Sequence, residues 1–412
     1  MPQFGLLGRK LGHSFSVPIH HALLCPDYEL IEIEPDALPD FLRAKAFKGL
    51  NVTIPYKQTV MPFCDEISDQ AREIGAVNTL VNDNGVIRGF NTDILGFKAM
   101  VRAARIDFEA AKVLILGSGG TSKTARAACR SMGAREIVVI SREGPVTYAD
   151  IEKHADADIV VNTTPVGMYP NCPAKLIDLR VFKTLKGVVD VVYNPARTGI
   201  ILQARELGIA HVSGLKMLVE QAVAAEEYFL STEIDASLGQ KVFEDLACET
   251  RNIVLIGMPG SGKSTLGKVL ADRSHKTLVD LDTEIERAAG CTIPEIFATE
   301  GEAGFRAIET EVAARFGKES RLVIACGGGI VTRPENLPLL RQNGRIYEIV
   351  RDLEKLPVDN RPLSKNLDNL RAMARLRAPM YEAFRDVRID NNGAIEAAQE
   401  NIWRDFRAHS GD

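Results

Sequence analysis

The stretch NIVLIGMPGSGKST, residues 252–265, decides the fold class of the second half of this chain. A short apolar run, Asn252–Ile256, is typical of a buried strand, and the glycines after it interrupt the run before a helical pattern begins. Residues Gly257–Thr265 fit the pattern G-x-x-x-x-G-K-[ST] in the strand–loop–helix context that this pattern requires. Backbone N–H groups of such a loop can cradle phosphates, so the sequence predicts a nucleotide-binding α/β domain.

Two acidic residues follow at the end of the next expected strand. The segment VDLDTEIE carries Asp280 and Asp282, and the alternation of a strand would aim both carboxylates to one side. One carboxylate can help to hold magnesium through water, and the other can accept a proton from a substrate hydroxyl. In the loop itself, Lys263 can reach the β- and γ-phosphates of ATP, and Ser264 can ligate magnesium. These residues predict phosphoryl transfer and leave the acceptor open.

Several arginines and a run of glycines indicate which kind of molecule accepts the phosphoryl group. A guanidinium grips a carboxylate at two points, so Arg306, Arg361 and Arg377 suit a small anionic molecule. The order of the phosphate loop, DLDTEIE, EGEAGFRAIE, CGGG, RPL and RAPMY between residues 252 and 392 resembles that of the shikimate kinase family. The resemblance implies that shikimate contacts Asp282, Arg306, Gly328, Gly329 and Arg377, and that ATP contacts Gly260, Ser261, Gly262, Lys263, Ser264, Thr265 and Arg361.

The same resemblance implies roles in catalysis. Asp282 would accept the proton of the shikimate hydroxyl, and Lys263 and Arg361 would neutralise charge on the transferred phosphate. Asp280 would hold magnesium through water, beside Ser264. Only eight residues separate Asp352 from Arg361, and none of them is an arginine, whereas the mobile lid of this family is commonly longer, so the resemblance bears less on nucleotide affinity and lid closure than on the chemistry.

A second glycine-rich turn lies in the first half of the chain. In KVLILGSGGTSKTA, residues 112–125, a buried strand runs into Gly117, Gly119 and Gly120 and then into a helical pattern. These glycines can bring backbone N–H groups close to a pyrophosphate at a helix N-terminus, although Ser122 stands where G-x-G-x-x-G has its third glycine. A tight structural turn is the alternative.

The end of the following strand bears on the cofactor. Arg142 stands there first and Glu143 follows it. An arginine at this place can take the extra phosphate of NADP, whereas an acidic residue usually holds the ribose hydroxyls of NAD. The order of the two favours NADP without settling it.

A lysine and an aspartate before this turn are candidates for proton transfer. NVTIPYK places Lys57 just past a proline turn, and GFNTDILGF supplies Asp93. Brought together, the two could share a proton, while nearby hydroxyls and amides could hold a polyol and its carboxylate. Taken singly, the lysine fits a solvated surface and Asn-Thr-Asp fits a helix cap.

Eight motifs in register over residues 4–222 closely resemble the shikimate dehydrogenase family: GLLGxxLxHSxS, NVTIPYK, GAVNT, NTDxxGF, GSGG, NTTPVGM, DVVYNP and GLKMLVEQA. The resemblance implies that NADPH reduces 3-dehydroshikimate to shikimate and that Lys57 and Asp93 are the catalytic pair. It implies a shikimate site made of Ser14, Ser16, Thr53, Asn78, Tyr193 and Gln221. It places Gly214 and Met217 near the nicotinamide.

Strand-like runs alternate with helical patterns, which predicts an α/β protein with largely parallel sheets. We expect a substrate-binding domain over residues 1–99, completed by a helix near 214–235, and a Rossmann-like NADP-binding domain over 100–213. A kinase domain with a phosphate loop and a parallel sheet would occupy residues 250–412, after a polar, weakly patterned boundary at 231–251. The connection between residues 143 and 158 is short for the family, which predicts a thinner wall beside the adenosine.

Composition excludes several classes of protein. With 412 residues the chain exceeds one ordinary hydrophobic core, and 45% hydrophobic and 25% charged residues are normal for a soluble globular protein. The net charge is −5 with no basic stripe, so nothing suggests a nucleic-acid or membrane partner. The seven dispersed cysteines indicate no disulfide framework or zinc site, and no signal peptide is visible. We expect a cytoplasmic protein, and a homo-oligomer is compatible with the sequence.

The two resemblances imply consecutive steps, because the product of the first half would be the substrate of the second. The leading interpretation is therefore a bifunctional enzyme. One alternative pairs a quinate-preferring dehydrogenase with another small-metabolite kinase, such as one for gluconate. The other alternative is a ligand-sensing or structural module in which one half has lost activity.

Overall fold

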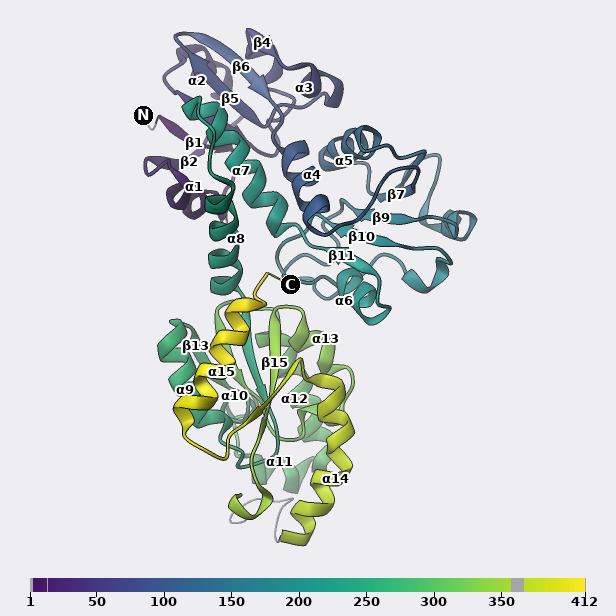
Figure 1. The fold of residues 1–412 in the computed structure, drawn as a ribbon, viewed down its shortest axis with the longest axis vertical. Coiled ribbons are helices and arrows are strands. Elements are labelled where there is room, and N and C mark those ends of the chain that lie inside the picture. The colour runs from purple at the N-terminus through teal and green to yellow at the C-terminus, as the bar shows by residue number, and fades with distance from the viewer. Residues whose placement is uncertain (1–2, 13, 357–366, 412) are drawn as a thin grey trace. The chain divides into compact units, whose positions relative to one another are not determined.

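Three sheets organise the chain, and the computed structural model describes residues 3–12, 14–356 and 367–411. The chain divides into two units, neither of which is continuous in sequence (Figure 1). Unit 1 comprises Met1–Val166, Lys175–Tyr193 and Gln203–Phe243. Unit 2 comprises Gly167–Ala174, Asn194–Leu202 and Glu244–Asp412. We call Gly167–Ala174 and Asn194–Leu202 the early loops, because they belong to unit 2 but come early in the sequence.

The first sheet of unit 1 is mixed, with strand order β2-β1-β3-β5-β6-β4. β1, β2 and β3 are parallel, as expected, but β5 runs antiparallel to both β3 and β6. The antiparallel pairing of β5 with β6 follows from a tight hairpin at Asn84 and Gly85, whose φ angles of 49° and 93° suit a two-residue turn. The strands are β1 (Phe4–Gly8), β2 (Tyr28–Glu32), β3 (Gly49–Val52), β4 (Glu66–Ile67), β5 (Thr79–Asp83) and β6 (Val86–Phe90).

Helices from both ends of unit 1 accompany this sheet. They are α1 (Ser16–Leu23), α2 (Leu38–Ala44), η1 (Met61–Phe63), α3 (Asp69–Ile74), α4 (Asp93–Ala103), α7 (Leu215–Leu230) and α8 (Ala236–Thr250). α7, which lies within the expected helical stretch 214–235, packs against α4 and α1. No helix in the described part of the chain is both long enough and apolar enough to cross a membrane.

The segment 231–251 differs from the expectation of a weakly patterned linker, because most of it forms α8. Val242, Leu246 and Ala247 are buried at helical spacing along it. Polar residues between them hide the periodicity in the sequence. The division between the units, after Phe243, falls inside this helix.

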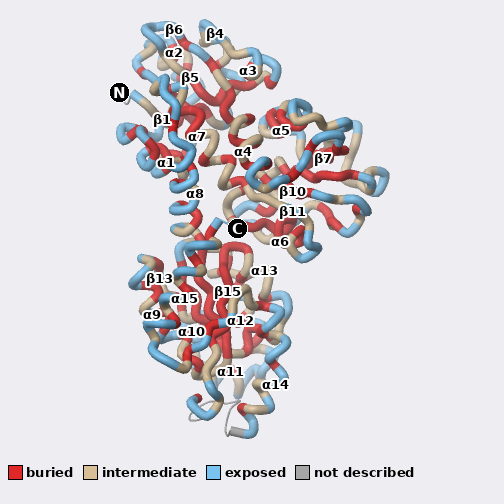
Figure 2. Tube along the Cα trace, in the orientation of Figure 1, coloured by how far each residue is buried: buried red, intermediate tan, exposed pale blue. Residues whose placement is uncertain are grey.

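The second sheet of unit 1 is parallel throughout, with order β11-β10-β9-β7-β8. Its strands are β7 (Lys112–Leu116), β8 (Glu136–Ile140), β9 (Ile159–Asn162), β10 (Gly187–Asp190) and β11 (Ala210–Val212). The connecting helices are α5 (Gly120–Ser131), η2 (Tyr148–His154), η3 (Leu179–Val181) and α6 (Gly199–Glu206). The inner strands β7, β9 and β10 are buried along their whole length (Figure 2).

The edge strand β8 is less covered. Ile137, Val138 and Val139 are only half-buried, and the connection that follows them contains a single helical element, η2. The sheet therefore forms as expected, and its wall beyond β8 is thin, also as expected from the short connection.

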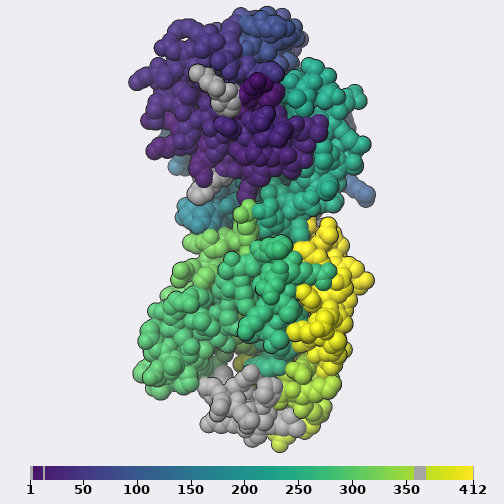
Figure 3. Space-filling view, turned by 90° about the vertical axis from the view of Figure 1, so that its left-hand side faces the viewer, coloured from purple at the N-terminus to yellow at the C-terminus, as the bar shows by residue number. Residues whose placement is uncertain are grey.

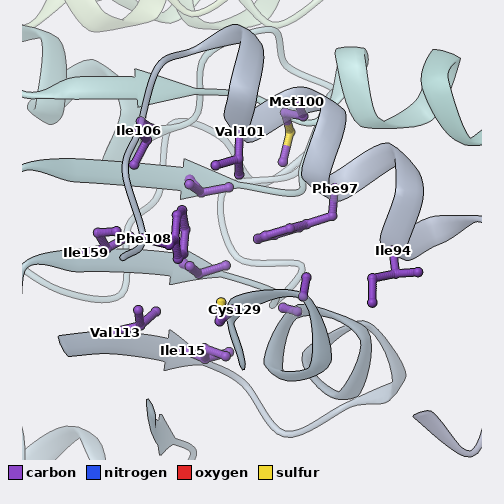
Figure 4. Close-up of a cluster of buried hydrophobic side chains, with 14 of the residues drawn as sticks. Ile94, Phe97, Met100, Val101, Ile106, Phe108, Val113, Ile115, Cys129 and Ile159 are labelled. Atoms are coloured by element: carbon purple, nitrogen blue, oxygen red, sulfur yellow. The ribbon is translucent and has the colours of Figure 1, made fainter. Parts of the chain in front are cut away.

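A hydrophobic cluster joins α4 to the second sheet (Figure 4). Phe97 and Val101 of α4 face Val113 of β7 and Ile159 of β9 across this cluster, and all four side chains are buried. Burial of one such side chain stabilises the fold by about 1.5–3 kcal/mol. The cluster fixes α4, whose first residue, Asp93, belongs to the site described below.

Unit 2 contains a parallel sheet of order β13-β14-β12-β15-β16. Its strands are β12 (Asn252–Ile256), β13 (Thr277–Asp280), β14 (Leu322–Ala325), β15 (Gly344–Val350) and β16 (Val387–Asp390). Its helices are α9 (Lys263–Ser274), α10 (Leu281–Ala289), α11 (Ile293–Thr299), α12 (Gly301–Gly317), η4 (Ile330–Thr332), α13 (Asn336–Arg341), η5 (Leu353–Lys355), α14 (Leu367–Phe384) and α15 (Ile395–Ala408). The C-terminal helix α15 lies on the surface beside α9 (Figure 3).

The early loops are bonded firmly into unit 2. Arg197 is only 2% exposed. Its backbone N–H donates to the carbonyl of Gln342 at 2.8 Å, and its Nη1 donates to the carbonyls of Arg341 at 2.8 Å and Gly344 at 3.1 Å. The turn between α13 and β15 therefore has its carbonyls satisfied by a segment from the first half of the sequence.

Candidate active sites

A cleft of about 240 Å³ in unit 1 brings together most of the residues expected around shikimate and the nicotinamide. Its lining includes Ser14, Ser16, Asn51, Thr53, Lys57, Asn78, Asp93, Thr121, Tyr193, Gly214, Met217 and Gln221. The expected cofactor residues Gly117, Gly119, Gly120 and Arg142 are not part of this lining.

Lys57 and Asp93 form an ion pair at the cleft, with Nζ and Oδ2 2.6 Å apart. Lys57 lies in the turn after β3, and Asp93 is the first residue of α4. Their side chains are 27% and 15% exposed, so both remain accessible from the cleft. The aspartate fixes the direction of the ammonium group, which can then donate a proton or a hydrogen bond to a bound oxygen.

Amides and hydroxyls make up the polar wall beside this pair. The side-chain carbonyl of Asn78 accepts from the backbone N–H of Thr92 at 2.7 Å, and its amide donates to the Thr92 hydroxyl at 3.1 Å. At the start of α1, the hydroxyl of Ser14 donates to that of Ser16 at 3.0 Å. Burial raises the pKa of Tyr193, so its phenol stays protonated and can donate at neutral pH.

A buried pair behind the cleft was missed by the sequence analysis. The ring of His20 shares a hydrogen bond of 2.9 Å with Glu226 and stacks on Tyr28 at 3.8 Å. Tyr28 in turn donates to Asn51, which lines the cleft, at 2.8 Å. Burial lowers the pKa of His20, which favours the neutral imidazole. No sequence signal could have paired His20 with a residue 206 positions away.

The glycine turn after β7 fits a pyrophosphate. Gly117 has a φ of 104°, and α5 begins at Gly120. A Cβ at Gly119 or Gly120 would meet nothing within 4 Å, so the backbone N–H groups at the start of α5 are open to a ligand. Arg142 is exposed directly after β8, on a segment where a 2′-phosphate could reach it.

A pocket of about 550 Å³ in unit 2 brings the second set of expected residues together. Its lining includes Gly260, Gly262, Lys263, Ser264, Thr265, Asp280, Asp282, Arg306, Gly328, Gly329 and Arg377. Ser261 is fully buried behind the loop. Arg361, like His13 of the first motif, lies outside the described residues.

The loop after β12 has the conformation that phosphate binding requires. Gly260 and Gly262 have φ angles of 82° and 97°, and a Cβ on Gly262 would come within 2.5 Å of the amide of Asn391. Nζ of Lys263 donates to the carbonyls of Gly257 at 2.9 Å and Met258 at 3.0 Å. These carbonyls hold the ammonium group at the mouth of the loop, so the residues fit a nucleotide phosphate.

The relation between Asp280 and Asp282 differs from the expected alternation along a strand. β13 ends at Asp280, which caps α10 by accepting from the backbone N–H of Asp282 at 3.1 Å. Asp282 therefore lies in the first turn of a helix, yet both carboxylates line the pocket. The hydroxyl of Ser264 donates to Asp280 at 2.7 Å, so these two expected magnesium ligands are adjacent and fit the ion. Among the described residues, no three His, Cys, Asp or Glu side chains converge as a metal site.

The acceptor side of the pocket holds two buried guanidinium groups. Nη1 of Arg306 donates to Glu309 at 2.7 Å, and Nη1 of Arg377 donates to the carbonyl of Gly328 at 3.0 Å. Tyr381 donates to the same carbonyl at 2.6 Å. The sequence analysis missed Glu309 and Tyr381, although the i, i+3 spacing of Arg306 and Glu309 on one helix is a signal that could have found the pair.

Two family profiles match different parts of the chain. The family profile described as "Shikimate dehydrogenase substrate binding domain" matches residues 6–80, and the profile described as "Shikimate kinase" matches residues 259–406. "Shikimate dehydrogenase (NADP(+))" of Clostridium perfringens is 36% identical over 269 residues, which cover 60% of this chain and 99% of that protein.

Two solved structures are similar to the first part of the chain. A chorismate mutase/shikimate 5-dehydrogenase fusion protein from Clostridium acetobutylicum is 36% identical with a TM-score of 0.56, over 59% of this chain and 96% of the other. Shikimate 5-dehydrogenase from Thermus thermophilus, solved in complex with NADP(H) and shikimate, is 30% identical with a TM-score of 0.54. The second match covers 59% of this chain and 98% of the other.

Proposed function

The chain belongs to the shikimate dehydrogenase family and carries a shikimate kinase domain after that part, and from this premise we propose that it catalyses two consecutive reactions. The first reduces 3-dehydroshikimate to shikimate with NADPH. The second phosphorylates shikimate to shikimate 3-phosphate with ATP and magnesium. The observation that carries the proposal is the presence, in one chain, of two pockets that gather the acid–base pair of the first reaction and the phosphate loop and acceptor groups of the second.

In the dehydrogenase site, NADPH supplies the hydride when it is bound. Lys57 holds the 3-oxo group of the substrate and gives it a proton as negative charge develops on that oxygen. Asp93, 2.6 Å from the ammonium nitrogen, keeps the lysine correctly oriented. Ser14 and Ser16 bind the substrate carboxylate through their hydroxyls.

The remaining polar groups of this cleft orient the ring. Thr53, Asn78 and Gln221 donate to or accept from the substrate hydroxyls, and Tyr193 donates its phenolic proton. Gly214 and Met217 border the nicotinamide. Burial of Asn78 and its bonds to Thr92 fix one amide rotamer, which favours one orientation of the substrate.

Cofactor binding in this half uses backbone more than side chains. The backbone N–H groups of Gly119 and Gly120, at the start of α5, would hold the pyrophosphate. Gly117 allows the turn through its φ of 104°. Arg142 binds the 2′-phosphate of NADP, which distinguishes this cofactor from NAD.

In the kinase site, the loop Gly260–Thr265 cradles the phosphates of ATP, and Lys263 neutralises the β- and γ-phosphates. Ser264 and Asp280 would hold magnesium, which would neutralise charge on the phosphates. Asp282 accepts the proton of the shikimate hydroxyl as its oxygen bonds to the γ-phosphorus and the bond from that phosphorus to the leaving ADP breaks.

The acceptor is recognised through its carboxylate. Arg306 and Arg377 bind it, with Gly328 and Gly329 leaving room for the ring. A Cβ on Gly329 would collide with the guanidinium of Arg306, so a larger residue at this position would displace that group. Arg361, which lies outside the described residues, would neutralise charge on the transferred phosphate.

A coupled assay of the purified chain tests the proposal. We expect ADP to form from 3-dehydroshikimate only when NADPH, ATP and magnesium are all present, and shikimate alone to bypass the need for NADPH. Quinate and gluconate, offered as competing substrates, should be poor. Faster turnover of either one, or saturable shikimate binding without turnover, would contradict the proposal. The domain boundaries, a cytoplasmic location and a homo-oligomeric state remain predictions from the sequence.

A further inference from the structure

Arg351 lies directly after β15, beside the start of the phosphate loop. β15 pairs in parallel with β12, so the two strands end at the same edge of the sheet. The backbone at Ile349 passes so close to Gly257, the first residue of the loop, that a Cβ on this glycine would collide with the Ile349 carbonyl. Arg351 therefore leaves the sheet next to the loop, and its side chain lines the same pocket as Lys263 and Arg377.

Unlike the other cations of this pocket, Arg351 has no partner within the described part of the chain. Its Nε is buried and makes no hydrogen bond. The acidic residues that follow it are engaged elsewhere, Asp352 with Lys355 at 3.1 Å and Glu354 with Arg371 at 3.5 Å. A buried donor without an acceptor costs stability, so such a group in a ligand pocket points to an acceptor supplied by the ligand.

We propose that Arg351 binds the terminal phosphate of ATP, an inference that rests on the proposed kinase function. The loop Gly260–Thr265 and Lys263 already surround the inner phosphates. The terminal phosphate must lie between this loop and the acceptor groups Asp282 and Arg377, which border the same pocket as Arg351. The planar guanidinium fork suits phosphate oxygens, and a phosphate would satisfy the buried Nε.

The charge of the pocket agrees with this role. Lys263 is held by two backbone carbonyls, and Arg306 is held by Glu309 and Glu302. Arg351 forms no ion pair among the described residues, because the neighbouring acids Asp352 and Glu354 pair with Lys355 and Arg371. A multiply charged phosphate is the ligand group whose binding gains most from such a cation.

The test uses the full chain and compares two variants with a matched control. Arg351→Met keeps the apolar stem and removes the donors, and Arg351→Lys keeps the charge without the fork. Arg388→Ala removes an exposed arginine from β16, the neighbouring strand, outside this pocket. The dehydrogenase rate of each sample reports the concentration of folded protein independently of the kinase site.

Calorimetric binding of AMP, ADP and a non-hydrolysable ATP analogue, each with magnesium, measures the effect phosphate by phosphate. We expect Arg351→Met to weaken the triphosphate analogue by about ten- to a hundredfold, the range for a lost hydrogen bond to a charged group, and to leave AMP unchanged. Arg351→Lys should lose less affinity for the triphosphate analogue, and Arg388→Ala should lose none. The Michaelis constant for ATP should rise with that for shikimate unchanged.

Several outcomes would overturn the inference. Equal weakening of AMP, ADP and the triphosphate analogue would mean that Arg351 supports the fold or the adenosine side. A rise in the Michaelis constant for shikimate alone would mean that Arg351 contacts the acceptor and not ATP. Unchanged binding of all three nucleotides would mean that Arg351 contacts no nucleotide. If the wild type binds the triphosphate analogue but does not phosphorylate shikimate, the proposed function fails while the binding series still decides the role of Arg351.

Discussion

The carboxylate of Glu309 accepts a hydrogen bond from Nη1 of Arg306 across 2.7 Å, and both side chains are buried in unit 2. Burial raises the pKa of Glu309 to about 7, and the guanidinium of Arg306 works against this rise. Asp282 raises the same pKa further, and Arg377 lowers it. The charge of Glu309 therefore changes near neutral pH, and with it the extent to which the protein itself neutralises Arg306.

We expect the Michaelis constant for shikimate to increase by about three- to tenfold as the pH rises from one unit below this pKa to one unit above it. Ionised Glu309 competes with the shikimate carboxylate for Arg306, and protonated Glu309 does not. Glu309→Gln should flatten the profile, while the Michaelis constant for ATP should show no such difference. A wild-type profile for shikimate that is flat over this range would contradict the prediction.

The same pKa has a consequence for stability. Because the folded pKa lies above the ordinary 4.5, the contribution of Glu309 to stability is complete below about 4.5 and is lost as the pH rises through about 7. Urea unfolding of unit 2 at several pH values, followed by kinase activity, should show this loss in the wild type and not in Glu309→Gln.

Lys57→Ala should reduce dehydrogenase turnover by about 10²–10⁴-fold, because it removes the proton donor from the cleft. Kinase turnover of the same sample should stay near normal. The matched control is Lys48→Ala, at an exposed lysine outside the cleft, which should change neither activity. Equal damage to both activities would mean that Lys57 supports folding instead.

Arg142→Ala should weaken the preference for NADP over NAD, mainly through a higher Michaelis constant for NADPH. The 2′-phosphate would lose its guanidinium partner, whereas NADH has no such phosphate to lose. Arg135, at the opposite end of β8, supplies the control Arg135→Ala. Initial rates with both cofactors measure the effect, and a wild type that uses NADH as well as NADPH would refute the prediction.

Arg377→Lys should raise the Michaelis constant for shikimate in the kinase reaction about ten- to a hundredfold, a loss of about 1.5–3 kcal/mol. Lysine keeps the charge but cannot make a two-point contact with a carboxylate. The constant for ATP and the dehydrogenase rate should barely change. Arg371→Lys, on the same helix but outside the pocket lining, is the control. A higher Michaelis constant for ATP would contradict the placement of Arg377 on the acceptor side of the pocket.

Separate expression of residues 1–240 and 250–412 should give a soluble dehydrogenase and a soluble kinase, because each carries its own sheets and site. The second fragment lacks Arg197, which donates to the carbonyls of Arg341 and Gly344 in the full chain. We therefore expect the kinase to unfold about 1–3 kcal/mol more easily as a fragment, and Arg197→Ala in the full chain to reproduce part of the loss. Aggregation of both fragments would argue against the boundary.

Much of the fold follows from local patterns. Apolar runs such as Lys112–Leu116 and Asn252–Ile256 become strands with the expected bounds, because burial on both faces leaves little choice of side chain. The antiparallel hairpin of the first sheet and the helix α8 were not predicted. The hairpin depends on two turn residues, and the apolar stripe of α8 is diluted by polar residues.

The residues of the two candidate sites were also predicted only in part. Residues carried by sequence motifs, such as Lys57, Asp93 and Lys263, do line the two pockets. Residues whose role depends on a distant partner were out of reach, because tertiary contacts decide them. The pair of His20 and Glu226 is one example. Arg351 is another, since only the structure shows that its neighbouring acids are engaged elsewhere.

The early loops also set an order of events during protein synthesis. Arg197 bonds to carbonyls 144 and 147 positions later in the chain. A ribosome adds about 5–20 residues each second, so roughly 7–30 s pass between the synthesis of this loop and that of its partners. Water or a chaperone must accept the hydrogen bonds of the Arg197 donors in the meantime. The first residues of unit 2 are thus synthesised before the last two segments of unit 1, yet unit 2 can complete its hydrogen bonds only near the end of translation.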